Sequence, residues 1–374
     1  MPQDYNKTLN LPETDFPMRG NLPKREPDTL KKWDEERLYY KMIEKNKGKP
    51  SYILHDGPPY ANGDIHLGTA LNKVLKDIIV KYKNMSGYCS PYVPGWDTHG
   101  LPIELKAMKA IGVENGAIPP IELRKHCKDF ALSFVENQKN QFKRLGVLGD
   151  FDDPYLTLKP EFEARQVKIF GEMAKKGYIY KGLKPVYWCP ECQTALAEAE
   201  IEYSDDPCFS IYVKFKVTDD KDMFTALGID LDKTYFVIWT TTTWTLPGNM
   251  AICLGPEYDY CIVKANGENY VMAEYLVPEV MAKAGITEYE TVGRFTGAQL
   301  EGCKTEHPFM GRPSPIIVGS HVTLESGTGC VHTAPGYGVD DFEVCKNYDD
   351  VGIVVGVDGK GVLTKDSGMF EGLT

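Results

Sequence analysis

The sequence predicts an α/β fold in which a half-domain built on a parallel sheet is followed by a β-rich region. In the first half, a strand, a loop, a helix and a second strand follow one another between residues 51 and 93. That order is typical of a βαβ unit, whose two strands are parallel. From about residue 178 the chain becomes rich in Val, Ile, Thr, Tyr and Gly, which favours strands. We therefore expect a domain boundary at about residues 180–200.

In the first half, the run at residues 51–55 predicts a buried strand that ends at the turn-forming string DGPP. Apolar residues then recur at helical spacing between residues 71 and 82, and residues 88–93 predict the second strand. Similar spacing predicts further helices at residues 28–45, 121–145 and 161–176. In the second half, the expected strands are residues 210–217, 235–241, 258–263, 316–318 and 352–357.

Composition narrows the class of protein. The chain has 374 residues, 42% hydrophobic and 25% charged, which is typical of a globular protein with two or three domains. A net charge of −11 disfavours a nonspecific nucleic-acid coat protein, although local lysine-rich faces remain. The N-terminus is polar, no apolar run approaches the roughly 18 residues of a membrane span, and the ten cysteines are scattered. These features predict a cytoplasmic protein with reduced thiols that does not enter a membrane.

The string GDIHLGT at residues 63–69 lies where the first strand passes into the helix. Open α/β sheets bind ligands at this place, and helix amides there attract phosphate. His66 could donate a hydrogen bond to a phosphate oxygen, and Gly68 would let a flat base approach the backbone. By itself the motif is weak, because a histidine near a helix start is commonly structural.

Longer strings around this motif closely resemble the isoleucyl-tRNA synthetases. They are HDGPPYANGDIHLG at residues 55–68 and PGWDTHGLPIE at residues 94–104. The resemblance runs from about residue 10 to the last residue. It implies a class I synthetase with a Rossmann-like nucleotide-binding half-domain and an inserted β-rich editing domain. The implied divisions are an N-terminal extension at 1–50, the first part of the catalytic domain at 51–180, a connecting ribbon at 181–200 and the editing domain at 201–374.

The resemblance also implies a reaction and its residues. Isoleucine and ATP, with Mg²⁺, would form isoleucyl-adenylate, and the acyl group would pass to the tRNA for isoleucine. Gly63, His66 and Gly68 would contact ATP. The family signature is His-x-Gly-His, whereas this chain has Thr69 at the fourth, catalytic position. Because Thr cannot supply a positive charge, we expect weaker activation than in a relative that has His there.

Three further residues would form the isoleucine pocket. The resemblance implies that Gly57 and Pro58 line it and that Asp97 takes the substrate ammonium, since a buried carboxylate pairs well with that charge. A turn or capping role for Asp97 is the alternative.

Cys189 and Cys192 form a Cys-x-x-Cys knuckle, which suits half of a tetrahedral zinc site. The chain has no second Cys-x-x-Cys. The pair is therefore either half of a zinc site or a structural remnant without metal, and redox use is the least favoured interpretation because no thioredoxin-like setting surrounds it.

Two strings in the second half resemble the editing site of isoleucyl, valyl and leucyl synthetases. They are WTTTTWTLPGN at residues 239–249 and GTGCVHTAPGYGVDD at residues 327–341. The resemblance implies an editing site at Thr240, Thr241, Thr242, His332 and Asp341. Asp341 would hold the ammonium of the misattached amino acid, while Thr242 and His332 would shape the pocket and place water. Thr243 and Tyr337 stand where Pro and His are usual in the family.

The family that this chain resembles needs both an activation site and an editing site for a physical reason. Isoleucine and valine differ by one methylene, which a pocket senses by only about 1–3 kcal/mol, a limit for which isoleucyl-tRNA synthetases are the standard example. A second, smaller site that admits valine supplies the remaining discrimination.

The family's Lys-Met-Ser-Lys-Ser loop does not occur in the sequence. The resemblance thus implies the N-terminal portion of a synthetase, either a truncated gene product or a cut piece, and we expect it not to aminoacylate tRNA alone. The alternatives are a stand-alone aminoacyl-tRNA deacylase, a non-catalytic tRNA- or protein-binding remnant, and a nucleotidyltransferase with a His-x-Gly loop.

Overall fold

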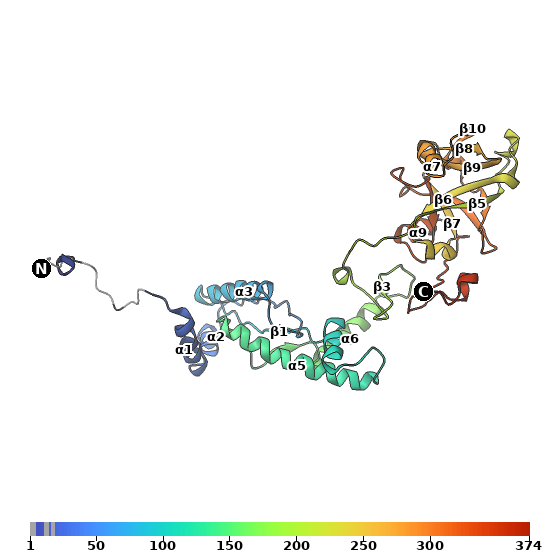
Figure 1. Ribbon diagram of the computed structural model, residues 1–374. Helices are drawn as coiled ribbons and strands as arrows, with labels where there is room; N and C mark the ends of the chain where they lie inside the picture. Colours follow the sequence, from blue (N-terminus) through green and yellow to red (C-terminus); the bar gives the residue numbers. More distant parts are fainter. Residues whose placement is uncertain (1–4, 11–14, 16–18) are drawn as a thin grey trace. The chain divides into compact units, whose positions relative to one another are not determined.

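The structure is a computed structural model that describes residues 5–10, 15 and 19–374 (Figure 1). The chain divides into two compact units, unit 1 up to Tyr180 and unit 2 from Lys181 onward. Each unit has its own apolar core. Within the described ranges, no helix combines the length and the apolarity that crossing a membrane requires.

Unit 1 is mainly helical. The predicted helices at 121–145 and 161–176 are confirmed, and the periodic segment 71–82 lies inside a longer helix. The elements are η1 (Tyr5–Thr8), α1 (Leu22–Glu35), α2 (Leu38–Asn46), α3 (Leu67–Met85), α4 (Leu101–Ile111), α5 (Pro120–Arg144) and α6 (Pro160–Lys175).

The single helix predicted at 28–45 is wrong, because the structure has two helices there. Arg37 lies between α1 and α2 with φ 51°, in the left-handed region that interrupts an α-helix. Its guanidinium lies 4.4 Å from the centroid of the Tyr40 ring. This cation–π contact helps to offset the cost of the unusual backbone conformation.

The parallel pairing in unit 1 is confirmed, but the strands are much shorter than predicted. Residues 51–55 and 88–93 form no continuous strands; they meet in one parallel bridge, Ser51 with Cys89. A second parallel bridge joins Tyr60 to Asp97. The sheet itself consists of β1 (Gly95–Trp96) and β2 (Tyr155–Leu156), which are parallel.

The reason is that side chains take the backbone groups that a strand ladder would use. The N–H of Ser90 donates to Asn84 Oδ1 at 3.2 Å, and the N–H of Tyr92 donates to the hydroxyl of Tyr39 at 3.0 Å. The N–H of Gly95 donates to Asp56 Oδ2 at 2.8 Å. Prolines alternate with these residues in the string SPYVPG at 90–95, and each proline lacks a ladder donor.

Unit 2 is built on a mixed nine-stranded sheet in the order β10-β8-β9-β6-β13-β7-β12-β11-β5, and β5 also pairs with β6. The strands from β6 through β13, β7, β12 and β11 to β5 therefore form a closed ring. The strands are β5 (Ile211–Asp219), β6 (Thr234–Thr240), β7 (Ala251–Leu254), β8 (Asp259–Ala265), β9 (Glu268–Ala273), β10 (Glu290–Thr296), β11 (Lys304–Glu306), β12 (Pro313–Val318) and β13 (Cys330–Thr333). A separate hairpin consists of β3 (Trp188–Cys189) and β4 (Thr194–Ala195).

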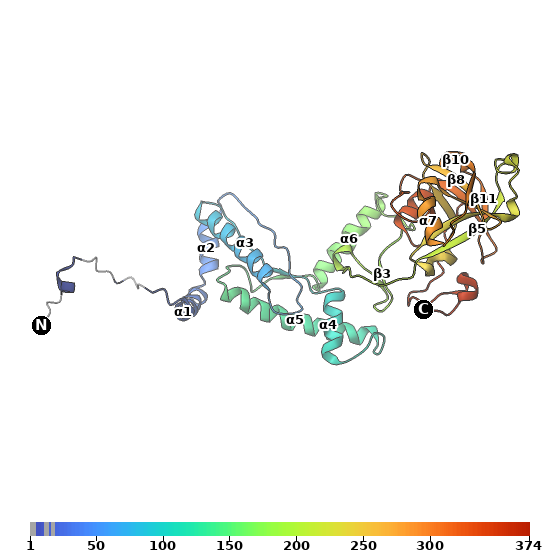
Figure 2. The same ribbon diagram turned by 45° about the horizontal axis from the view of Figure 1, so that its top comes forward.

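Short helices complete unit 2, and α7 packs its apolar side chains into the same core as the strands (Figure 2). They are η2 (Glu198–Glu200), η3 (Thr225–Leu227), η4 (Leu231–Lys233), η5 (Thr243–Gly248), η6 (Glu274–Leu276), α7 (Val277–Lys283), α8 (Gly297–Leu300), α9 (Val339–Cys345) and η7 (Lys365–Phe370).

Four of the five strands predicted in this half are confirmed, by β5, β6, β8 and β12. The strand predicted at 352–357 is wrong. Gly356 makes its hydrogen bonds outside a ladder: its N–H donates to the Tyr337 hydroxyl at 2.7 Å, and its carbonyl accepts from Ser367 Oγ at 2.7 Å.

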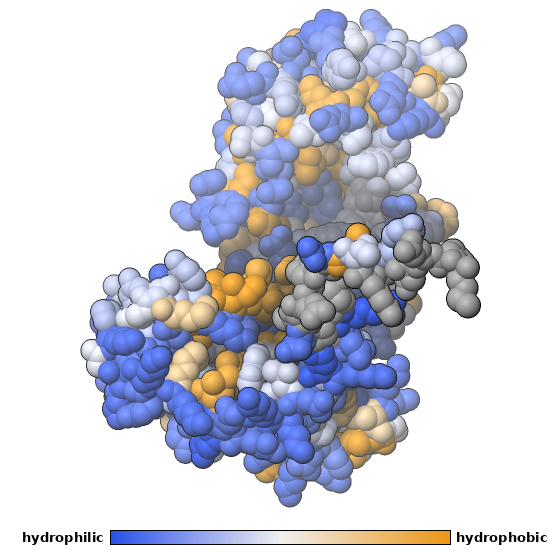
Figure 3. Space-filling view, turned by 90° about the vertical axis from the view of Figure 1, so that its left-hand side faces the viewer, coloured by the Kyte–Doolittle hydropathy of each residue, from blue (hydrophilic) through white to orange (hydrophobic). Residues whose placement is uncertain are grey.

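An apolar stripe runs along the exposed face of α3. Its members are Leu67, Leu71, Leu75, Ile78 and Tyr82, whose side chains are 87%, 59%, 51%, 56% and 60% exposed. Figure 3 shows that apolar side chains, in orange, also gather among polar ones on the face that it presents. Exposed apolar surface of this kind favours association.

We expect the isolated chain to self-associate, and the double substitution Leu71→Lys with Ile78→Lys to reduce that association without lowering the melting temperature. Sedimentation velocity over a range of concentrations checks this. Asn72→Lys, on an exposed position of the same helix, is the control for added charge. A wild-type chain that stays monomeric at all concentrations contradicts the expectation.

Candidate functional site

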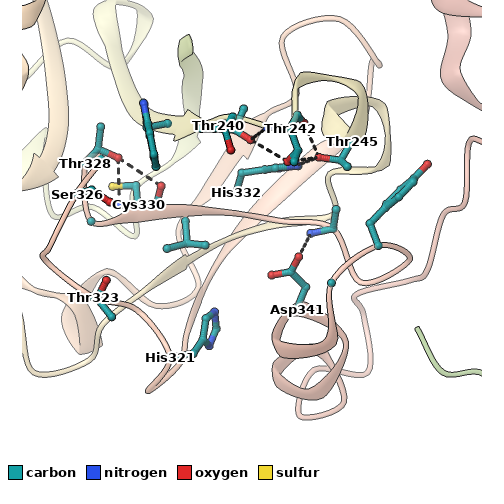
Figure 4. Close-up of a pocket in the computed structure, with 18 of the residues that line it drawn as sticks. Thr240, Thr242, Thr245, His321, Thr323, Ser326, Thr328, Cys330, His332 and Asp341 are labelled. Carbon is teal, nitrogen blue, oxygen red and sulfur yellow. Dashed lines mark hydrogen bonds between the residues drawn. The ribbon is translucent and has the colours of Figure 1, made fainter. Parts of the chain in front are cut away.

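A cavity of about 430 Å³ lies in unit 2, where β6 ends and β13 and α9 approach it (Figure 4). It brings together all five residues that the sequence resemblance implies for the editing site: Thr240, Thr241, Thr242, His332 and Asp341. Thr240 ends β6, and the next two threonines lead into η5. His332 lies on β13, and Asp341 lies in the first turn of α9.

The threonine hydroxyls form a connected set. Thr240 Oγ1 accepts the N–H of Thr242 at 3.1 Å and lies 3.2 Å from Thr242 Oγ1. Thr242 Oγ1 in turn lies 3.3 Å from Thr245 Oγ1. Thr245 belongs to the run that suggested this site, but only the tertiary structure shows it in contact with His332.

His332 is buried, and both of its ring nitrogens have protein partners. Nδ1 lies 2.8 Å from Asn249 Nδ2, and Nε2 lies 3.0 Å from Thr245 Oγ1. Asn249 Nδ2 also donates to the Ala251 carbonyl at 2.9 Å, so that nitrogen is a donor. Nδ1 of His332 must then accept, and Nε2 carries the proton and donates to Thr245.

This network fixes the charge of His332 as well as its tautomer. Burial, reinforced by the nearby His307, lowers the pKa of His332 to about 4. The ring is therefore neutral near pH 7 and acts as a rigid support for the threonine set. Neither nitrogen is available to take a proton from water.

Asp341 combines burial with a single backbone anchor. Its Oδ2 accepts the N–H of Ala334 at 3.2 Å. Burial raises the pKa of Asp341, while the Ala334 hydrogen bond and the charge of His321 act in the opposite direction. The ionised form of such a desolvated carboxylate is stabilised most when a cation enters the cavity beside it.

We expect the stability of unit 2 to fall as the pH drops from about 6.5 to about 4. Burial lowers the pKa of both His332 and His307 to about 4, so folding favours their neutral forms. The free energy of unfolding that the two histidines contribute is fully present above their pKa in the unfolded chain. It is lost as the pH falls through their pKa in the folded chain, and the loss is up to about 3 kcal/mol per histidine. The raised pKa of Asp341 opposes part of this loss.

Chemical unfolding at several pH values, followed by circular dichroism, measures this slope. His332→Gln is expected to make the slope shallower, whereas His126→Gln in unit 1 is the matched control. An unfolding free energy of unit 2 that stays constant between pH 7 and pH 4.5 would contradict the expectation.

In unit 1, His66 is the N-cap of α3. Its Nδ1 accepts the N–H groups of Gly68 at 3.1 Å and Thr69 at 3.3 Å. Nδ1 is therefore unprotonated while it caps, and Nε2 carries the proton and remains able to donate. A Cβ on Gly68 would lie 3.0 Å from His66 Cε1, so the glycine also makes room for the capping ring.

The loop before α3 is held by amide side chains of α5, which sequence reasoning missed. Gln138 Nε2 donates to the Tyr60 and Gly63 carbonyls at 3.0 and 2.7 Å. Gln141 Oε1 accepts the N–H of Ile65 at 2.9 Å, and its Nε2 donates to Asp64 at 2.7 Å. Polar residues on a long helix give no sequence signal that distinguishes this role from solvent exposure.

The segment with Gly57 and Pro58 runs beside Asp97. The N–H of Asp97 donates to the Pro59 carbonyl at 2.9 Å, and the Asp97 carbonyl accepts from Ala61 at 3.0 Å. Asp97 Oδ1 accepts the N–H of His99 at 3.3 Å, which is the contact expected for a turn role. The structure therefore pairs Asp97 with residues 59–61, which directly follow Gly57 and Pro58 in the chain, and also gives Asp97 a local structural contact.

Beneath this segment lies a buried ion-pair cluster that sequence reasoning did not single out. Asp56 pairs with Lys73, and its Oδ1 lies 2.9 Å from Lys76 Nζ. The Tyr155 hydroxyl donates to the Asp56 carbonyl at 2.7 Å. Asp56 thus ties the loop to α3 and β1 through its carboxylate and to β2 through its backbone carbonyl.

The Cys-x-x-Cys knuckle lies at the β3–β4 hairpin. Cys189 Sγ accepts the N–H of Cys192 at 3.3 Å, and this hydrogen bond lowers the pKa of the Cys189 thiol. Across the described ranges, no cluster of three or more His, Cys, Asp or Glu side chains could hold a metal. Two thiols supply half of a tetrahedral zinc site, so the described residues do not complete one.

Comparison with known proteins identifies the family. The family model for class I tRNA synthetases of the I, L, M and V group matches residues 28–292, which is more than half of the chain. The chain belongs to the class I tRNA synthetases.

Three curated relatives of this synthetase chain are isoleucine–tRNA ligases. The one from Caldicellulosiruptor saccharolyticus is 60% identical over 370 residues, covering 99% of the chain and 40% of the relative. Thermoanaerobacter sp. (strain X514) gives 61% identity at the same coverage, and Moorella thermoacetica gives 56% with 39% of the relative covered. The chain therefore spans about 40% of the length of the curated relatives it matches.

The matched range of this class I synthetase chain contains the whole loop around His66 and the threonine run of the cavity. His332 and Asp341 lie beyond residue 292, outside the match. Their placement in the cavity therefore rests on the structure.

Proposed function

We propose that the chain carries the amino-acid activation loop and the hydrolytic editing site of an isoleucine–tRNA ligase. The observation that carries the proposal is the cavity of unit 2, where a half-buried carboxylate, a hydroxyl set and a neutral histidine line one space. The curated isoleucine–tRNA ligases at about 60% identity support the choice of amino acid. The enzyme would act in the cytoplasm, as the cysteine pattern predicts.

In the editing site, the substrate is valine esterified to the tRNA for isoleucine. Asp341 accepts hydrogen bonds from the α-ammonium of valine, pairing opposite charges away from water. Thr240, Thr241 and Thr242 surround the ester and the terminal ribose with hydroxyl donors. His332 holds this set in place, because its neutral ring is locked between Asn249 and Thr245.

Unit 1 provides one half of a Rossmann-like ATP site in this proposal. His66 Nε2–H donates to a phosphate oxygen of ATP, which is bound with Mg²⁺, and Gly63 and Gly68 lie against the nucleotide. Thr69 takes the place of the second signature histidine. Gly57, Pro58 and Asp97 form part of the isoleucine pocket, with Asp97 facing the ammonium. Cys189 and Cys192 would supply two ligands if the longer protein completes a zinc site.

The test is hydrolysis of aminoacyl-tRNA by the purified chain without ATP. We expect valyl-tRNA for isoleucine to be deacylated faster than isoleucyl-tRNA, because the proposed editing site admits the valine side chain and excludes the larger isoleucine side chain. Cys208→Ser, at an exposed cysteine outside the cavity, is the matched control. Equal rates for the two esters, or no rate above spontaneous hydrolysis, would overturn the proposal.

A further inference from the structure

Two histidines line the cavity, and only His332 has its hydrogen-bonding needs met inside the protein. His321 is the other one. Its Nε2 is closed off from solvent and has no hydrogen-bond partner in the part of the chain that the structure describes. A buried polar atom without a partner costs about 1–3 kcal/mol, so such an atom in a pocket wall points to a partner that reaches it only when the site rearranges around its substrate.

The backbone makes room for this ring. His321 follows β12, and its ring lies against Gly319, where a Cβ would come within 2.8 Å of Cε1 and 2.9 Å of Nδ1. The ring also borders a second cavity, whose lining includes Pro256, Asp340 and Glu343. It therefore forms part of the wall between two solvent-sized spaces.

His321 is close enough to Asp341 for the two groups to interact electrostatically. Figure 4 shows both side chains below His332 in the view. A group beside Asp341 lies beside the reacting ester, because Asp341 holds the ammonium next to the ester carbonyl in the proposed complex.

The other titratable side chains that line the cavity are already engaged or protonated. Both ring nitrogens of His332 have partners, and Asp341 is assigned to the ammonium. The Tyr337 hydroxyl accepts a backbone N–H, and burial raises the pKa of both Tyr337 and Cys330, so both stay protonated and cannot take a proton from water. Hydrolysis still needs a group that can hold and deprotonate water, and His321 is the side chain that remains.

We propose that His321 is a catalytic residue of the deacylation, which holds the attacking water and takes its proton. This inference rests on the proposed editing function. The water oxygen bonds to the ester carbonyl carbon while one water proton passes to the imidazole. The bond between the carbonyl carbon and the ribose oxygen then breaks, and the imidazole returns the proton to that oxygen. The products are free valine and tRNA, and no redox step occurs.

The experiment measures kcat and KM for valyl-tRNA deacylation by the 374-residue chain and its variants. We expect His321→Leu to lower kcat about 100-fold with little change in KM, the range for loss of a general base. The kcat of His321→Gln should fall between those of the wild type and of His321→Leu, because an amide can hold water but cannot take its proton. Glu343→Gln, at a residue that lines the neighbouring cavity and not the first one, should match the wild type.

Binding of a non-hydrolysable 3′-valylamido-adenosine separates catalysis from pocket damage. We expect His321→Leu to bind this probe as tightly as the wild type. A weakened affinity that accounts for the whole loss of rate would overturn the inference, and so would a wild-type kcat in His321→Leu. If the wild type hydrolyses valyl-tRNA and Asp341→Asn does not, while His321→Leu does, the editing function stands and this inference falls. A wild-type chain without hydrolysis overturns both.

Discussion

Asp341→Asn is expected to reduce valyl-tRNA deacylation by about 10–100-fold in kcat/KM, the value of a hydrogen bond to a charged partner. Asn has nearly the same shape as Asp and can still accept the N–H of Ala334 through its carbonyl oxygen. It cannot supply the negative charge that pairs with the ammonium. The deacylation assay with valyl-tRNA measures the loss, and Asp340→Asn, at an exposed neighbour, is the matched control.

The same substitution is expected to leave unit 2 at least as stable at neutral pH. Burial raises the pKa of Asp341, so the folded state favours the protonated carboxyl. The stability that this group contributes is present below the unfolded pKa and is lost as the pH rises through the folded pKa. At neutral pH the wild type therefore bears the cost of a desolvated charge, which Asn does not have. If Asp341→Asn lowered both the deacylation rate and the melting temperature, Asp341 would be a structural residue.

Asp56→Ala is expected to destabilise unit 1 by about 3–5 kcal/mol, the usual cost of removing one partner from a buried ion pair. Lys73 is 1% exposed and would lose its carboxylate partner in the core. The Gly95 N–H and the Lys76 ammonium would also lose an acceptor. Urea unfolding of the full chain measures the change, and the transition of unit 2 serves as an internal reference.

A matched control lies in the same loop. Asp64 is exposed and accepts hydrogen bonds from Asn137 and Gln141, so Asp64→Ala is expected to cost far less than Asp56→Ala. Burial disfavours ionisation of Asp56, but the charge and hydrogen bond of Lys73 outweigh it and hold the pKa of Asp56 below its usual range. Its contribution is therefore present above the unfolded pKa and lost as the pH falls through the folded pKa. Equal destabilisation by the two substitutions would contradict the assignment.

Local patterns explain which elements could be predicted. The helices α5 and α6 carry apolar residues at helical spacing over many turns, and the strands β5, β6 and β8 are rich in β-branched and aromatic residues. The predictions of strands at 88–93 and 352–357 were wrong for one reason. Side chains from other parts of the chain satisfy their backbone groups, as Asn84 does for Ser90 and Tyr337 does for Gly356.

The candidate sites divide in the same way. Long contiguous strings of residue types mark Thr240, Thr241, Thr242, His332 and Asp341 in the sequence, and the folded chain gathers them around one cavity. The tautomer of His332 could not be predicted, because it depends on Asn249, whose own orientation is set by the Ala251 carbonyl. A single histidine such as His321 carries no pattern in the sequence.

By itself, the sequence determined the family resemblance, the α/β and β-rich halves and the residue types of both sites, because these depend on local periodicity and on long contiguous strings. The tertiary structure alone decided the electrostatics: the pairing of Asp56 with Lys73, the neutrality of His332, the raised pKa of Asp341 and the unpartnered nitrogen of His321. Burial and hydrogen-bond partners set these properties, and both come from residues far apart in the chain.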